Sequence, residues 1–206
     1  MVCVFQFSDY SFKANSFLIA DEESCEAAII DPSMDRDSYE EILKKNGYHL
    51  KYILITHNHF DHVWNYDDLY ESFGVTGLIE QTELDGINDS YSNASFLMVL
   101  DFRLKSPLKP LNYSDCYCLG KHEIRCIKTP GHTSGSVSFF CDEKLFCGDL
   151  LFCGSIGRTD ISGGSISMLI DSVEKLFQLL PQDTVVFPGH GPETTLKQEA
   201  LNNPFL

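Results

Sequence analysis

The sequence predicts a layered α/β sandwich, in which helices cover the outer faces of packed sheets. Short apolar runs typical of strands alternate with amphipathic stretches, in the order strands, helix, strand, helix, strands, helix, strand, helix. The composition, 43% hydrophobic and 22% charged, is that of an ordinary globular protein. A length of 206 residues suits one core, so we expect a single domain over residues 1–206.

Strands are predicted where short, mainly apolar runs lie between turn residues. These runs fall at residues 2–7, 15–20, 27–30, 51–56, 122–129, 136–141, 144–147 and 184–187. The run at 51–56 is apolar without interruption from Tyr52 to Ile55, which is typical of a buried strand. It leads directly into His57.

Helices are predicted where apolar residues recur with helical spacing. These stretches fall at residues 38–45, 62–73, 92–100, 166–180 and 194–201. Gly47 and Gly74 follow the first two and can end them in the left-handed conformation that glycine adopts freely. Ser165 precedes the clearest apolar stripe, at 166–180.

The stretch from residue 81 to residue 114 has the weakest pattern in the chain. The helix at 92–100 is the element predicted there, and Pro107 and Pro110 mark a loop. Because segment 86–110 is long and poorly patterned, it is a candidate lid over a site.

Charge and cysteine content limit the location and the partners of the protein. A formal net charge of −15 argues against nucleic acid as a partner, since phosphate binding needs a basic face. No apolar run approaches the about 20 residues of a membrane span. The first residues lack the basic and apolar regions of a secretory leader. The eight cysteines include no Cys-x-x-Cys pair, so we expect free thiols in a cytoplasmic protein whose oligomeric state the sequence does not indicate.

Ligand-type side chains are concentrated directly after the strand at 51–56. His57, His59, Asp61 and His62 place three imidazoles and one carboxylate within six residues. On a loop at a strand end, alternate residues point to the same side, so His57 and His59 can converge on one metal ion. As the chain turns into the next helix, Asp61 and His62 can face a second ion.

Three more ligand-type residues follow predicted strands, each beside a glycine that lets the backbone turn sharply. They are His132 after Gly131, Asp149 after Gly148, and His190 after Gly189. Five of the seven histidines lie in these motifs. We interpret the remaining two, His49 and His122, as ordinary surface or strand histidines.

This pattern of histidines and aspartates resembles the metal signature of the metallo-β-lactamase superfamily along nearly the whole chain. The resemblance implies a four-layer αβ/βα sandwich with the site at one edge. It also implies two metal sets: His57, His59 and His132 for the first ion, Asp61, His62 and His190 for the second, and Asp149 bridging both.

The donor set indicates the chemistry. Histidine and aspartate ligands without cysteine fit two Zn²⁺ ions best, although such sites also tolerate iron or manganese. Two ions ~3.5–4 Å apart can hold a bridging hydroxide and polarise a carbonyl or phosphoryl oxygen. We therefore predict hydrolysis of an activated ester, thioester, lactam or phosphodiester, with Asp61 and Asp149 as catalytic carboxylates. Class B1 and B2 β-lactamases carry a cysteine at the position of Asp149, which argues against those types.

Three segments, 148–152, 157–160 and 187–195, resemble the glyoxalase II-like (hydroxyacylglutathione hydrolase-like) group, especially its short members. That resemblance implies a small-molecule thioester substrate such as S-lactoylglutathione. The chain ends at Leu206, so we expect it to lack the C-terminal helical domain that contacts glutathione in full-length members. Arg158 can bind a substrate carboxylate, or it can instead tie its own loop to Asp160.

Two other functions stay open. Persulfide dioxygenases share the Gly-Arg-Thr-Asp-like segment and use a single iron ion, for which His57, His132 and Asp149 could serve. A non-enzymatic metal-binding role is the third hypothesis, although a complete set of seven ligands argues against it.

Overall fold

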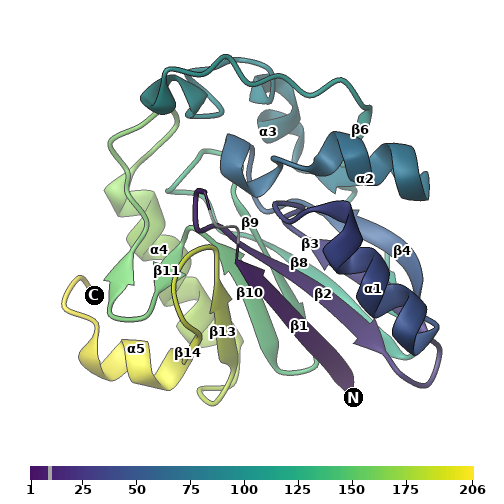
Figure 1. Cartoon of the computed structure of the whole chain (residues 1–206). Helices are drawn as coiled ribbons and strands as arrows, with labels where there is room; N and C mark the ends of the chain where they lie inside the picture. The colour runs from purple at the N-terminus through teal and green to yellow at the C-terminus, as the bar shows by residue number, and fades with distance from the viewer. Residues whose placement is uncertain (9–10) are drawn as a thin grey trace.

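Two six-stranded sheets face each other in the computed structural model, which describes residues 1–8 and 11–206 (Figure 1). The first sheet has the strand order β1 (Val2–Ser8), β2 (Asn15–Asp21), β3 (Glu26–Ile30), β4 (His49–Leu54), β5 (Gly77–Ile79) and β6 (Leu108–Pro110). The second has the order β14 (Thr194–Thr195), β13 (Val185–Pro188), β10 (Lys144–Gly148), β9 (Val137–Cys141), β8 (His122–Lys128) and β7 (Tyr117–Leu119). A hairpin of β11 (Leu151–Phe152) and β12 (Ser155–Ile156) forms a separate two-stranded sheet.

Helices cover the outer faces of both sheets (Figure 1). Packed on the first sheet are α1 (Arg36–Asn46) and α2 (Tyr66–Phe73), and α3 (Gln81–Gly86) follows β5. Packed on the second are α4 (Ile166–Leu179) and α5 (Leu196–Asn202). Two 3₁₀ turns are η1 (Phe60–His62) and η2 (Ser95–Met98). Within the described residues, no helix has the length and apolar character that a bilayer span requires.

Alternation along the central strands produces the layers. Phe17 on β2 packs between the two sheets, whereas its neighbour Leu18 packs under α1 and α2. On β10, Phe146 faces the space between the sheets and Leu145 faces α4. Because successive strand residues point to opposite faces, each sheet buries one face on the other sheet and one on helices. The predicted four-layer αβ/βα sandwich is confirmed.

The four loops predicted to carry ligands follow β4, β8, β10 and β13, and they meet at one edge of the two sheets. Gly148 ends β10 with a φ of +51°, and a Cβ there would overlap the side chain of Thr56. Only glycine combines this left-handed conformation with so close an approach, which turns the chain so that Asp149 points to the site.

The weakly patterned segment differs from its prediction. The helix predicted at 92–100 is wrong: Ala94 and Val99, with φ of +60° and +58°, limit the regular part to the 3₁₀ turn η2. The predicted loop is confirmed at Pro107, which lies outside regular structure, and is wrong at Pro110, which ends β6 and pairs with β5. Since β6 is an edge strand, its proline is tolerated.

Two predicted helices begin later than expected. The chain at His62 forms η1, and α2 starts only at Tyr66, because His62 has to turn toward the site before the helix begins. At the end of the chain, β14 takes the first two residues of the stretch 194–201, and α5 begins at Leu196.

Candidate metal centre and adjoining cavity

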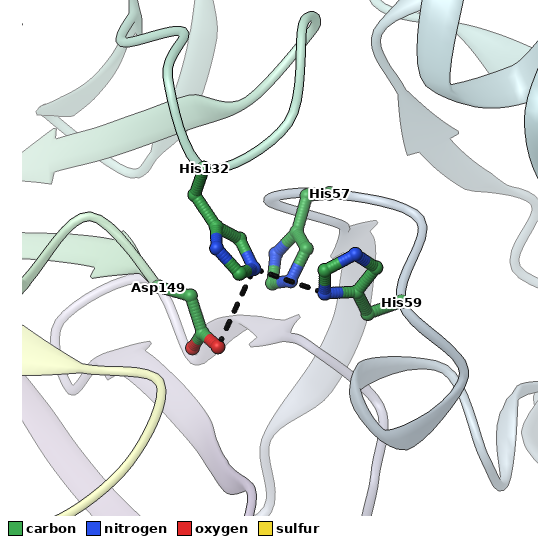
Figure 2. Close-up of side chains that lie close together, drawn as sticks. All are labelled: His57, His59, His132 and Asp149. Carbon is green, nitrogen blue, oxygen red and sulfur yellow. Dashed lines mark hydrogen bonds and ion pairs between the residues drawn. The ribbon is translucent and has the colours of Figure 1, made fainter. Parts of the chain in front are cut away.

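Four ligand-type side chains from three loops form the first group. His57, His59, His132 and Asp149 each offer one ligand atom, and these atoms all lie within 4.8 Å of one another. Figure 2 shows the three imidazoles and the carboxylate pointing toward a common centre. The Nε2 atom of His132 lies 2.9 Å from Nδ1 of His59 and 3.5 Å from Oδ2 of Asp149.

A second group, Asp61, His62 and His190, adjoins the first. Nε2 of His190 lies 3.3 Å from Oδ2 of Asp61 and 3.6 Å from Oδ2 of Asp149. Nε2 of His62 lies 3.3 Å from Oδ1 of Asp149. The carboxylate of Asp149 therefore contacts members of both groups, and the structure brings all seven sequence-predicted ligands together.

Several buried polar atoms in this cluster have no hydrogen-bond partner. They include Nε2 of His57, Nε2 of His62 and Oδ1 of Asp149. Leaving a buried polar atom unsatisfied costs about 1–3 kcal/mol, so native proteins rarely tolerate several together. Divalent cations would satisfy these atoms, and His and Asp are suitable ligands for them. The residues present fit a divalent metal centre.

The histidines of the two ligand groups differ in their protonation. Burial lowers the pKa of His57 well below 6.5 and that of His59 to about 3, so these imidazoles are neutral. Burial alone would also lower the pKa of His62, but the carboxylates of Asp149 and Asp61 outweigh it and raise that pKa well above 6.5. A cation beside His62 would replace a proton, because a metal ligand has to be deprotonated.

Each imidazole except His59 has its second ring nitrogen tied to a neighbour that fixes the orientation of the ring. These pairs are His57 Nδ1 with Thr56 Oγ1 at 2.9 Å, His62 Nδ1 with Asp31 Oδ2 at 2.9 Å, His132 Nδ1 with the Arg158 carbonyl at 2.8 Å, and His190 Nδ1 with the Lys13 carbonyl at 2.9 Å. Sequence reasoning missed Asp31 in this role. The one sequence feature that could have indicated Asp31 is its position directly after the predicted strand at 27–30.

A cavity of about 390 Å³ opens onto the metal centre. Both groups reach it, since Asp61, Asp149 and His190 are among its lining residues. Arg158 lines it as well, and its guanidinium donates to both carboxylate oxygens of Asp160, at 2.7 and 2.9 Å. The structure thus places Arg158 in both of the positions considered from the sequence, at the cavity and tied to Asp160.

The two histidines outside the motifs lie away from this centre. His49 is exposed on β4. His122, on β8, lies 3.6 Å from Asp21 and 3.4 Å from Asp142, outside the groups that could hold a metal among the described residues.

The αβ/βα sandwich fold and the cluster of histidine and aspartate ligands together define the class of the protein, which is that of the metallo-hydrolases. Residues 10–190 match the sequence profile of the Metallo-beta-lactamase superfamily. The chain belongs to this superfamily, which confirms the resemblance drawn from the histidine and aspartate motifs.

Relatives match nearly the whole chain. The probable metallo-hydrolase YqgX of Bacillus subtilis is 32% identical over 197 residues, which cover 94% of this chain and 92% of the relative. The hydroxyacylglutathione hydrolase GloC of Haemophilus influenzae is 33% identical over 211 residues, which cover 95% of this chain and 94% of the relative.

Solved structures agree with the fold over a similar span. The crystal structure of the BLEG-1 B3 metallo-beta-lactamase has a TM-score of 0.90 and 32% identity, and the match covers 99% of each chain. The di-iron-bound form of TTHA1623 has a TM-score of 0.85 and 32% identity, covering 98% of this chain and 100% of that one.

Proposed function

We propose that this protein is a dimetal hydrolase that cleaves a thioester of a hydroxy acid or a related acid. The observation that carries the proposal is the position of Asp149, whose two oxygens face both ligand groups at the wall of the cavity. Divalent ions bound there, for which we propose Zn²⁺, would supply hydroxide at neutral pH and polarise the carbonyl of the substrate.

The side chains have distinct tasks in this proposal. His57 and His62 are buried behind the cavity, where they hold metal without meeting substrate. Asp61 and Asp149 line the cavity, so they are the carboxylates placed to hold metal and to orient the attacking water beside the substrate. No serine or cysteine nucleophile is needed, because the attacking group comes from water.

Thioester cleavage is supported by the relative from Haemophilus influenzae, which is a hydroxyacylglutathione hydrolase. It is also supported by the extent of that match, which covers 95% of this chain and 94% of the relative. In this reaction water adds to the acyl carbon, the C–S bond breaks, and the thiolate leaves and takes up a proton.

The test is hydrolysis by the zinc-loaded protein of two thioesters, S-lactoylglutathione and a neutral lactoyl thioester of N-acetylcysteamine. We expect thiol release from at least one, lost on chelation and restored by zinc. Absence of turnover on both, with the metal shown to be bound, would overturn the proposal.

β-Lactam hydrolysis is a competing acyl transfer, because the neighbour BLEG-1 is described as a B3 metallo-beta-lactamase. A chromogenic cephalosporin in the same assay compares the two reactions directly. A kcat/KM higher for the cephalosporin than for every thioester would assign the site to lactams instead.

An iron-dependent persulfide dioxygenase is the second candidate, favoured by the convergence of His57, His132 and Asp149 and by the di-iron form of a structural neighbour. The variant His190→Ala discriminates, since a mononuclear oxygenase at the first group does not need His190. Hydrolysis should be lost in this variant, whereas oxygen uptake by the iron-loaded protein with glutathione persulfide would persist if the oxygenase hypothesis holds.

A further inference from the structure

Part of the wall of the cavity is apolar. It is formed by Phe12, Phe60, Ala94, Leu97, Met98 and Ile161. Leu97 and Met98 lie on η2 and are 44% and 54% exposed, which is high for apolar side chains beside a cavity. Exposed apolar surface at the mouth of a site is typical of a ligand-binding wall.

Hydrogen bonds hold the η2 segment, which carries part of this wall, against the metal loop. The backbone N–H of Phe60 donates to the carbonyl of Asn93 at 2.9 Å, which ties the start of the η2 segment to the metal loop. The buried side chain of Asn93 donates to the Ile87 and Phe102 carbonyls and accepts from Ser95 N. The left-handed conformation of Val99 is costly for a β-branched residue and persists only where the surroundings impose it. The apolar side chains of η2 are therefore presented to the cavity by a braced segment.

Apart from the proposed metal ions, positive charge at the cavity is scarce. Among its described lining residues, Arg158 is the one permanently cationic side chain, and its Nε and Nη2 already donate to Asp160. A glutathione thioester carries two carboxylates, which are costly to desolvate without cationic partners. The net charge of −15 adds repulsion at longer range.

We propose that the cavity selects thioesters with an apolar acyl chain and an uncharged thiol part, with Phe12, Leu97 and Met98 as specificity-determining residues. Asp160 contributes by occupying the guanidinium of Arg158 that would otherwise bind a carboxylate. This inference rests on the proposed thioester hydrolysis. It concerns which thioester is preferred.

The first experiment compares acetyl, butanoyl and hexanoyl thioesters of N-acetylcysteamine with S-lactoylglutathione on zinc-loaded protein. We expect kcat/KM to rise on the order of two- to fourfold per methylene, the gain from burying a CH₂ group. S-lactoylglutathione should be the poorer substrate. A flat or falling chain-length series, or a higher kcat/KM for S-lactoylglutathione, overturns the inference and leaves thioester hydrolysis standing. No turnover on any of them overturns both.

Variants at the wall test the residues. Leu97→Ala and Met98→Ala should each lower kcat/KM for the hexanoyl thioester several-fold, mainly through KM, and leave the acetyl thioester within about twofold. Leu100→Ala is the matched control, because it makes the same truncation on the same segment and Leu100 is not among the described residues that line the cavity. If kcat/KM falls equally for the acetyl and hexanoyl thioesters, the substitution damages the site in general. The assignment of Leu97 and Met98 as specificity-determining residues would then be wrong.

Binding gives a readout that is independent of activity. Trp64 is the single tryptophan, and its ring lies 4.9 Å from that of Phe12, so its fluorescence reports on the apolar wall. Two non-hydrolysable thioethers, S-hexyl-N-acetylcysteamine and S-hexylglutathione, share the same chain and differ in charge. We expect the neutral thioether to bind more tightly. Tighter binding of S-hexylglutathione that is lost in Arg158→Gln would overturn the inference.

Asp160→Asn completes the test, since it removes the competing carboxylate and leaves Arg158 in place. S-hexylglutathione should bind several-fold more tightly to this variant, with no change for the neutral thioether. Unchanged binding of both compounds would contradict the role of Asp160.

Discussion

The carboxylate of Glu83 accepts the backbone N–H of Asn58 at 2.9 Å, directly between the metal-type ligands His57 and His59. Its other oxygen accepts the backbone N–H of Gly135 at 2.7 Å, on the loop that follows His132. Glu83 is 2% exposed. One buried side chain on α3 thus joins two ligand loops that are more than 70 residues apart in the sequence.

Glu83→Gln should weaken both the fold and the first ligand group. An amide has one acceptor oxygen, so its NH₂ would face one of the two backbone N–H groups and leave it unsatisfied, at a cost of about 1–3 kcal/mol. We expect a lower free energy of unfolding and weaker zinc binding. Denaturant unfolding measures the free energy of unfolding, and competition with a chromophoric chelator measures the affinity for zinc. Asp85→Asn, the same change on the exposed side of α3, is the control, and equal behaviour of the two variants would contradict the role of Glu83.

Asp31→Asn should weaken the second ligand group more than the first, because Asp31 contacts His62 directly and reaches His57 only through the hydroxyl of Thr56. Asp31 accepts Nδ1–H of His62 at 2.9 Å and both the N–H and the hydroxyl of Thr56 at 2.8 Å. Replacing such an outer partner of a metal ligand lowers metal affinity about 10–100-fold. Asparagine tolerates the left-handed backbone of Asp31, whose φ is +53°, so strain should not confuse the result.

Metal titration of the Asp31 variant should show the site that contains His62 weakened more than the site that contains His57. Asp35→Asn provides the control, because Asp35 caps α1 away from the cluster and asparagine can replace it as a cap, so metal binding should not change. Wild-type affinity at both sites would show that Asp31 does not orient His62.

Asp149→Ala should remove turnover entirely, since its carboxylate faces both groups. We expect metal content, measured by atomic emission, to fall below that of His190→Ala, which disturbs only the second group. Substantial remaining activity with Asp149→Ala would show that the bridging assignment is wrong.

The local sequence pattern was sufficient to predict the ligands that directly follow strands. His57, His59, Asp61 and His62 are close in the sequence, and the buried strand before them fixes where the loop emerges. A layered α/β sandwich also follows from local pattern, because period-2 and helical apolar spacing report which faces are buried. The four-layer αβ/βα arrangement was predicted from the family resemblance.

Non-local contacts account for what the sequence did not predict. Glu83 reaches Asn58 and Gly135 only in the folded chain, and nothing near it in the sequence marks it as buried. The short strand β6 has a proline and little apolar pattern, and it exists because β5 offers it a partner. Likewise, η2 is held by Asn93, through hydrogen bonds that a helical or loop pattern does not encode.

A pH dependence is expected at Glu26, which joins the two sheets far from the metal centre. It accepts the N–H of Gly120 at 2.8 Å and the ammonium of Lys51 at 2.9 Å. The hydrogen bond from Gly120, with that from Lys51, lowers the pKa of Glu26 below 4.5. Since the pKa in the folded protein lies below that in the unfolded chain, the stabilisation is present above pH 4.5 and is lost as the pH falls through the folded value.

The free energies of unfolding of metal-free wild type and Glu26→Gln should therefore differ by about 1 kcal/mol at pH 7, and the difference should vanish in acid. Urea unfolding between pH 7 and pH 3 measures this difference. Glu41→Gln, on the exposed face of α1, makes the same charge change and should show no comparable dependence. A protonated carboxyl cannot hold an ammonium ion as a carboxylate does. If the difference in free energy of unfolding between wild type and Glu26→Gln stays constant from pH 7 to pH 3, the contact with Gly120 and Lys51 does not depend on the charge of Glu26, and the prediction is wrong.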